Sequence, residues 1–207
     1  MELLNYRGKL FGTGALLTTE RLFLPRRNWV PRIIFLIASI FAHGAQGEAF
    51  KEYEVKAAFL YHFAQFVEWP PEAFTNAATP LVIGILGSDP FGKTLDDLAQ
   101  NEIVKNRKLV VQRYRRVEEV GTCHILFISQ SEDGRLNQII PGLKGKNVLT
   151  VSDMENFVSR GGIIRLLTEK NKVKVRIDPA AAKAANLTIS SKLLRIAELV
   201  GPRGADR

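Results

Sequence analysis

The chain has 207 residues, of which 46% are hydrophobic and 24% charged, a composition typical of a globular protein that can build one well-formed core. The formal net charge is +8, but six of the 29 basic residues precede position 33, and residues 48–207 hold 23 basic and 19 acidic residues. So mild a surplus does not indicate a nucleic-acid-binding protein. The single cysteine, Cys123, excludes an intramolecular disulfide and a thiolate-rich metal or iron–sulfur site.

Residues 1–47 are predicted to be an N-terminal extension with a cleavable signal peptide. An apolar stretch over residues 33–41 is followed by small residues and preceded by basic residues, namely Arg26, Arg27 and Arg32. This order is typical of a secretory signal. The stretch is about half of the roughly 20 residues needed to span a bilayer, so we expect cleavage, before Ala45 or Glu48, and a soluble periplasmic protein. The paired arginines leave twin-arginine export as an alternative to the general secretory route.

Residues 48–207 are predicted to form a single α/β domain that opens with a helix over residues 50–68. This segment has no Gly or Pro, its apolar residues recur at helical spacing, and Pro70 and Pro71 end it. Because the helix is apolar nearly all round, we expect two layers or a second copy of the chain to bury it. A homodimer is therefore a candidate assembly.

Short apolar segments and helical segments alternate along the rest of the chain. The predicted strands cover residues 81–87, 108–114, 124–129, 147–151, 161–168 and 173–178, and the predicted helices cover residues 91–99, 132–140, 179–185 and 190–200. The alternation predicts a three-layer, Rossmann-like mixed sheet that is mostly parallel and flanked by helices. A tight turn over residues 169–172 joins the last two strands, so the sheet should end in an antiparallel hairpin.

The loop after the first predicted strand, residues 84–92, is the place to look for phosphate binding. It lacks the glycine pattern of dinucleotide- and P-loop sites, and Asp89 would repel a phosphate. Ordinary turn chemistry explains it better. The carboxyl end of such a strand is nevertheless where an α/β sheet binds a ligand, so Ser88, Asp89 and Phe91 are candidate ligand-binding residues.

No constellation of residues predicts catalysis. Residues 48–207 contain only His62 and His124, too few for a three-histidine metal site, and no nucleophile lies in a recognisable pairing with either. Adjacent acidic pairs at 96–97, 118–119 and 132–133 do not face each other on a helix and should lie on the solvated surface. We therefore expect no enzyme, no catalytic residues, no metal and no cofactor; a hydrolase with an unrecognised site is the enzymatic alternative.

Three segments together carry a family resemblance. They are Tyr53 to Pro70 (YEVKAAFLYHFAQFVEWP), Gly161 to Ile164 (GGII) and Ala181 to Leu194 (AAKAANLTISSKLL). Across residues 53–200 the chain resembles the YfiR-like family. The resemblance implies a mixed sheet flanked by helices, no catalysis, members that dimerise, and a periplasmic repressor that binds the sensor domain of an inner-membrane diguanylate cyclase. The family's disulfides have no counterpart here, because Cys123 has no partner within the chain.

The residues of these segments also have physical interpretations of their own. Trp69 is interpreted as a core aromatic or a ligand platform, and Glu68 as a candidate to close a pocket with Arg176 or Lys192. Serines at a helix start cap the helix or share its N–H groups with an anion. The candidate residues for binding a partner or ligand are His62, Glu68, Trp69, Ser88, Asp89, Phe91, Arg176, Ser190 and Ser191.

Two functions follow as hypotheses. The first is a non-enzymatic periplasmic regulator that binds and represses an inner-membrane diguanylate cyclase and so limits cyclic di-GMP signalling. The second is a periplasmic small-molecule binding or sensor protein whose ligand lies at the strand ends near residues 88–91.

Overall fold

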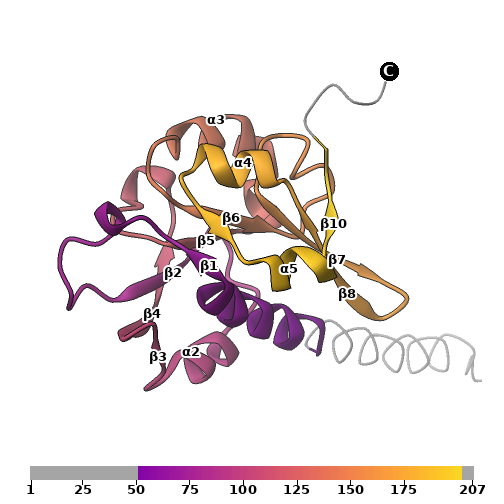
Figure 1. Cartoon of the computed structure of the whole chain (residues 1–207). Coiled ribbons are helices and arrows are strands. Elements are labelled where there is room, and N and C mark those ends of the chain that lie inside the picture. Colours follow the sequence, from indigo (N-terminus) through magenta and orange to yellow (C-terminus); the bar gives the residue numbers. More distant parts are fainter. Residues whose placement is uncertain (1–50, 202–207) are drawn as a thin grey trace, which may run out of the picture. The chain divides into compact units, whose positions relative to one another are not determined.

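The computed structural model describes residues 51–201 (Figure 1). The predicted extension, signal peptide and cleavage site lie outside these residues, and the boundary of the α/β domain at residue 48 stays a prediction. Among the described helices, none combines the length and the apolar character that crossing a membrane requires.

The described chain opens with a helix over residues 51–66, called the N-terminal helix below. The other elements follow in chain order: β1 (Val67–Glu68), η1 (Pro71–Ala73), β2 (Leu81–Leu86), α2 (Lys93–Ala99), β3 (Ile103–Val104), β4 (Arg107–Tyr114), η2 (Val117–Glu119), β5 (Ile125–Ile128), η3 (Gln130–Arg135), α3 (Leu136–Gly142), β6 (Leu149–Ser152), β7 (Ile164–Glu169), β8 (Lys172–Ile177), α4 (Pro179–Ala184), β9 (Thr188–Ile189), α5 (Ser191–Ile196) and β10 (Glu198–Leu199).

The main sheet has eight strands in the order β10-β8-β7-β6-β5-β2-β4-β3. The strands from β4 through β2, β5 and β6 to β7 run parallel, while β8 is antiparallel to β7. Lys170 and Asn171 form the turn of the β7–β8 hairpin. Their φ angles are 49° and 59°, and a two-residue hairpin loop of the commonest type needs positive φ at both positions. The predicted mostly parallel mixed sheet with a terminal hairpin is confirmed.

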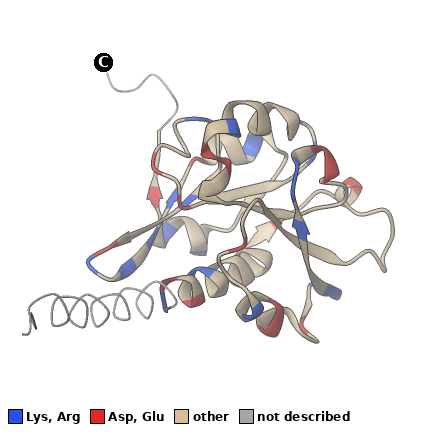
Figure 2. Ribbon diagram, turned by 180° about the vertical axis from the view of Figure 1, so that it is seen from behind, with Lys and Arg blue, Asp and Glu red and all other residues tan. Residues whose placement is uncertain are grey.

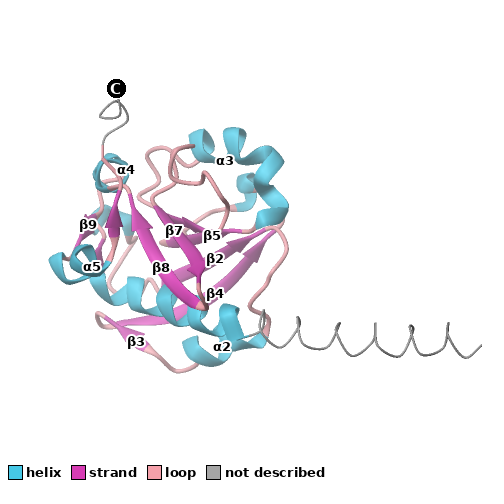
Figure 3. Cartoon of the chain, turned by 90° about the vertical axis from the view of Figure 1, so that its right-hand side faces the viewer, coloured by secondary structure: helices cyan, strands magenta, loops and turns pink. Residues whose placement is uncertain are grey.

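Helices cover both faces of this sheet, with α2 on one side and α3 on the other (Figure 3). Successive residues of a strand point to opposite faces, so β5 feeds two cores. Ile125 and Phe127 pack in the core beneath the N-terminal helix and α2, and Leu126 and Ile128 pack in the core beneath α3. The predicted three layers are thereby confirmed, and every residue of β5 is buried.

The N-terminal helix differs from its prediction in two ways. It ends at residue 66, because Val67 and Glu68 form β1, which pairs antiparallel with Ile189 and Thr188 of β9. It is also buried on one side only, with His62 and other polar residues of its outer face exposed. Burial of this helix by two layers of its own chain is therefore wrong, while burial by a second copy stays a prediction, and nothing in the described residues supports that homodimer.

The predicted helix over residues 190–200 is also wrong in its second half. α5 ends at Ile196, Ala197 is extended, and Glu198 and Leu199 form β10, which pairs in parallel with β8. Ile196 is 70% exposed and Leu199 55% exposed, although the helical prediction placed this stretch against the core. The backbone N–H of Val200 donates to the Ile177 carbonyl at 2.8 Å, so strand pairing replaces the last helical turn.

Smaller differences affect two other predicted helices. α2 begins at Lys93 rather than residue 91, with Gly92 at its N-cap. The segment predicted as one helix over residues 132–140 divides into the 3₁₀ helix η3 and the α-helix α3. Within it Glu132, which was expected on the solvated surface, is buried and forms an ion pair with Arg135 at 2.5 Å.

Candidate functional site

A buried charged cluster joins the N-terminal helix to the end of β6. The Lys56 ammonium donates to Asp153 Oδ2 at 2.6 Å, and the Tyr53 hydroxyl donates to the same oxygen at 2.8 Å. Glu52 lies one helical turn before Lys56, and its Oε1 is 2.5 Å from the Lys56 nitrogen. The side chains of Lys56 and Asp153 are each 3% exposed. Each charge has therefore lost its hydration and is stabilised by its partners in the cluster instead.

Sequence position explains how these groups meet. Asp153 is the first residue after β6, so it lies at the carboxyl edge of the parallel sheet, where open α/β sheets bind ligands. Tyr53 and Lys56 are three residues apart and share a helix face, and the Lys56 nitrogen also lies 4.5 Å from the centre of the Tyr53 ring. Burial, together with the hydrogen bond to Asp153, raises the pKa of Tyr53 and keeps its hydroxyl protonated as a donor.

Two hollows open beside this cluster, and they share four residues: Gln130, Asp153, Glu155 and Arg165. We call them together the carboxyl-edge cavity. One hollow has a volume of about 600 Å³ and the other of about 420 Å³. Arg165 comes from β7, where it pairs with Ser152 of β6, and Gln130 follows β5. Three adjacent parallel strands therefore supply the shared wall.

Two atoms of this wall are buried without a hydrogen-bond partner among the described residues, Asp153 Oδ1 and Arg165 Nε. Leaving a buried polar group unpaired costs about 1–3 kcal/mol, and more for a charged group. Buried polar atoms are almost always paired in native proteins. The only two exceptions among the described side chains thus lie in one cavity and are opposite in character, an acceptor and a donor.

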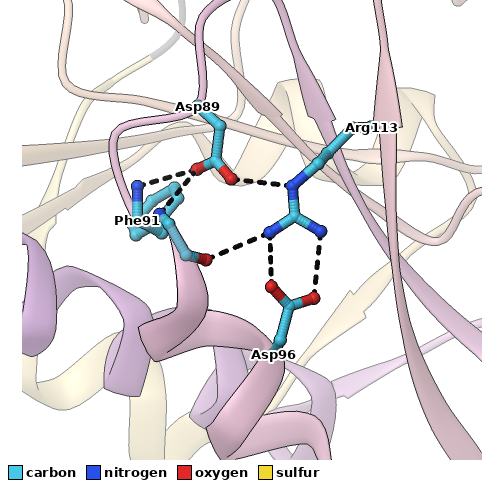
Figure 4. A network of polar contacts seen from close by, with 5 residues as sticks. Asp89, Phe91, Asp96 and Arg113 are labelled. Carbon is cyan, nitrogen blue, oxygen red and sulfur yellow. Dashed lines mark hydrogen bonds and ion pairs between the residues drawn. The ribbon is translucent and has the colours of Figure 1, made fainter.

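The predicted ligand position at residues 88–91 is instead filled by a network of the chain's own side chains (Figure 4). Asp89 Oδ1 accepts from the backbone N–H of Phe91 at 2.7 Å and of Gly92 at 3.3 Å. Its other oxygen accepts from Arg113 Nε at 2.7 Å, and the same guanidinium binds both carboxylate oxygens of Asp96 at 2.9 and 2.6 Å. The network attaches the loop before α2 to β4.

Neighbouring side chains fill the rest of that position. Phe91 is 3% exposed and packs edge-to-face against Tyr53 and Phe127, at 5.6 and 4.7 Å between ring centres. The Ser88 N–H donates to Ser131 Oγ at 2.9 Å. Of the three candidates here, Phe91 is a core residue and Ser88 and Asp89 are turn residues, which agrees with the turn chemistry predicted for this loop.

Glu68 and Trp69 lie at the opposite, amino edge of the sheet. They line a hollow of about 280 Å³ with Lys105 and Arg107. The Trp69 indole donates to the His124 carbonyl at 3.1 Å, so Trp69 is anchored to the core, as one of its two interpretations predicted. Lys105 donates to the Val67 carbonyl at 2.6 Å, and desolvation lowers its pKa although the Glu68 charge opposes this.

His124 is the buried centre of this edge. Its Nδ1 accepts from the Val82 N–H at 3.1 Å, its Nε2 lies 3.2 Å from the Ala73 carbonyl, and its ring stacks on Phe74 at 4.4 Å. Because a backbone N–H can only donate, Nδ1 carries no proton and Nε2 carries it. Burial lowers the pKa of His124 to about 4, with a smaller contribution from the charge of Arg107.

The remaining candidates are separated from one another. Arg176 lines the smaller hollow of the carboxyl-edge cavity but is bonded to Glu198 at 2.6 Å. Among the described residues Glu68 forms an ion pair with neither Arg176 nor Lys192, the two partners predicted for it. His62 is exposed and touches Gln65 at 3.4 Å. The Ser190 hydroxyl accepts from the Lys192 N–H at 3.2 Å, which confirms the predicted helix cap, and Ser191 is exposed.

Asp153 and Arg165 were missed by sequence reasoning, although the sequence carries a signal for each. Arg165 is the one charged residue in the apolar stretch of residues 163–167, and Asp153 directly follows a buried strand. Lys56 is likewise a charge inside an apolar helix. A charge retained in a buried segment indicates a partner across the fold, but one sequence cannot reveal which residue that partner is.

The distribution of charged residues and of metal-ligating side chains bears on which ligands the protein can bind. Basic and acidic residues are interspersed along the described ribbon (Figure 2), in agreement with the small charge surplus of the sequence. No three His, Cys, Asp or Glu side chains of residues 51–201 come together as a metal site. Cys123 is 5% exposed, and burial raises the pKa of its thiol to about 12.

Comparison with known proteins gives one informative match. The YfiR/HmsC-like family matches residues 53–198, a range that contains Lys56, Asp153 and Arg165. No curated protein matches the chain. Among solved structures, a conserved domain protein from Vibrio cholerae O1 biovar El Tor is similar, with 13% identity and a TM-score of 0.43 over 58% of this chain. The chain spans about half, 54%, of that protein's length.

Proposed function

The chain belongs to the YfiR/HmsC-like family, and on that premise we propose that it binds the periplasmic sensor domain of an inner-membrane diguanylate cyclase and represses the enzyme. The family supports a periplasmic regulator of a diguanylate cyclase in general. The observation that carries the proposal is the extent of the match, residues 53–198, which spans nearly all of the described sheet and helices. We further propose that the protein acts by binding and not by catalysis.

Repression by binding is a shift between two states of the cyclase. A partner that binds only the inactive state stabilises it in proportion to its differential affinity. Formation of the complex therefore lowers cyclic di-GMP without any chemical step on this chain.

The first experiment deletes the gene in its native strain and measures cyclic di-GMP, while the tagged full chain is used to recover partners from detergent-solubilised membranes. We expect cyclic di-GMP to rise on deletion and a diguanylate cyclase to be recovered. Deleting the recovered cyclase as well should return cyclic di-GMP to its original level. Unchanged cyclic di-GMP in the single deletion, or an increase that persists in the double deletion, contradicts the proposal.

Localisation has its own control. A chain that starts at Glu48 lacks the predicted signal peptide and stays in the cytoplasm, so we expect it to leave cyclic di-GMP high in the deletion strain. The full chain should restore repression, and its periplasmic form should begin at Ala45 or Glu48 by N-terminal sequencing. Equal repression by both forms contradicts periplasmic action.

The second candidate function, small-molecule binding, is favoured by a different part of the molecule from the one first predicted. The side chains of Asp89, Arg113 and Asp96 fill the position after β2, while the carboxyl-edge cavity lies at the ends of β5 and β6.

A further inference from the structure

The carboxyl-edge cavity presents one cation whose charge is not matched within the described residues. Arg165 forms no ion pair with a described side chain, whereas Arg160 and Arg176, which also line the cavity, are bonded to Asp133 and Glu198. Glu169 feels the charge of Arg165, but its carboxylate is bonded to Lys174 at 2.5 Å. Arg165 is therefore available to an anionic group that enters the cavity.

The cavity also presents acceptors that lack donors. Asp153 uses Oδ2 for Lys56 and Tyr53, and its buried Oδ1 has no donor. Glu155, an exposed residue in the same shared wall, forms no ion pair among the described residues. Lys56 alone faces both Glu52 and Asp153, so the negative charge around Asp153 exceeds the positive charge bonded to it.

From these groups we propose that the carboxyl-edge cavity binds a small zwitterion with a carboxylate and a primary ammonium group, the chemistry of an α-amino acid. The carboxylate pairs with the Arg165 guanidinium, and the ammonium lies beside the Asp153 carboxylate, with Glu155 at the opening. A volume of about 600 Å³ lies within the usual range of small-molecule sites, roughly 300–1,000 Å³. This binding is independent of the proposed repression.

Other ligand classes fit the same wall less well. A phosphate dianion would meet Asp153 and Glu155 without a second unpaired cation. An apolar ligand would leave the two buried polar atoms without partners. A ligand with an anionic group alone would leave Asp153 Oδ1 without a donor.

The test is calorimetric and thermal-shift titration of the purified, exported protein with each standard L-α-amino acid. The matched probes are its N-trimethyl betaine, which keeps both charges but has no N–H donor, and the carboxylic acid that lacks the amino group. We expect at least one amino acid to bind and to raise the melting temperature, and its two analogues to bind at least tenfold more weakly. Absence of binding by every amino acid, or equal binding of a betaine, overturns the proposal.

Substitution of Arg165 separates a binding role from a structural one. If Arg165 serves a ligand, Arg165→Met removes a half-buried charge that has no ion-pair partner among the described residues, so the ligand-free protein should melt at the same or a higher temperature while amino-acid binding falls at least tenfold. Arg115→Met, an exposed arginine outside the cavity, should retain binding. A lower melting temperature of Arg165→Met without ligand, or retained binding by this variant, contradicts the assignment of Arg165.

Discussion

At the scale of single residues, His124 connects the fold to pH. Its folded-state pKa of about 4 lies below the ordinary value of 6.5, so the unfolded chain binds the proton more readily. The contribution of His124 to the free energy of unfolding is therefore fully present above pH 6.5. It is lost as the pH falls toward 4, and the total loss is about 3 kcal/mol. Urea unfolding at several pH values should show this loss, and His124→Asn, whose side-chain oxygen can still accept from the Val82 N–H, should reduce it.

His62 provides the matched control for this prediction. It is the other histidine of the described residues, and it lies exposed on the outer face of the N-terminal helix. His62→Gln should keep the full pH dependence. If His124→Asn and His62→Gln change the slope of stability against pH equally, His124 is not the group responsible.

At the scale of elements, the start of α4 depends on one side chain. Asp178 Oδ1 accepts from the backbone N–H groups of Ala180 and Ala181 at 2.8 and 3.0 Å, and Pro179 occupies the first helical position. Asp178→Ala leaves both N–H groups without this acceptor and should lower the free energy of unfolding by about 1 kcal/mol. Asp178→Asn keeps an acceptor and should lose less. Urea midpoints measure both, and equal losses contradict the capping role.

The elements also show where sequence patterns are sufficient and where they are not. The strands β2 and β5 were predicted because buried parallel strands are continuously apolar. The β7–β8 hairpin was predicted from its turn residues, and α4 because Asp178 and Pro179 form a recognisable helix start. β10 was missed because the apolar residues from Ile196 to Val200 suit a helix equally well. Its conformation is decided by pairing with β8, a contact between distant segments that periodicity does not encode.

The candidate site divides in the same way. The parallel sheet predicts that a site lies at its carboxyl edge, but not which strand end carries it. The predicted position after β2 is filled, because Asp89 is held by Arg113, and the cavity opens beside Asp153 after β6. Ion pairs such as Lys56 with Asp153 join residues 97 positions apart, and a single sequence does not specify which buried charges meet.

At the scale of the whole molecule, Cys123 reports global unfolding. The chain has one cysteine, and its thiol is buried just before the central strand β5, with a pKa raised to about 12. A thiol reagent should therefore label it only when the core opens. We expect the labelling rate in native buffer, divided by that of the unfolded chain, to equal the unfolding equilibrium constant from urea titration.

A glycine beside the thiol tests this expectation. A Cβ at Gly84 would lie 2.7 Å from the Tyr114 ring and 2.8 Å from Cys123 Sγ, so Gly84→Ala should cost about 1–3 kcal/mol of stability. Labelling should accelerate by the corresponding factor, about tenfold for each 1.4 kcal/mol. Gly121→Ala, which meets no atom within 4 Å, should leave it unchanged. Rapid labelling that ignores Gly84→Ala contradicts labelling through global opening.

The pairing of β1 with β9 joins residues 67–68 to residues 188–189, and the Ser190 N–H donates to the Phe66 carbonyl at 2.9 Å. The N-terminal helix therefore acquires its last contacts from residues that are synthesised about 120 positions later. Contacts so distant along the chain form slowly. Most of the polypeptide leaves the ribosome before the fold can close, and an open chain is the form that can be threaded through a membrane channel.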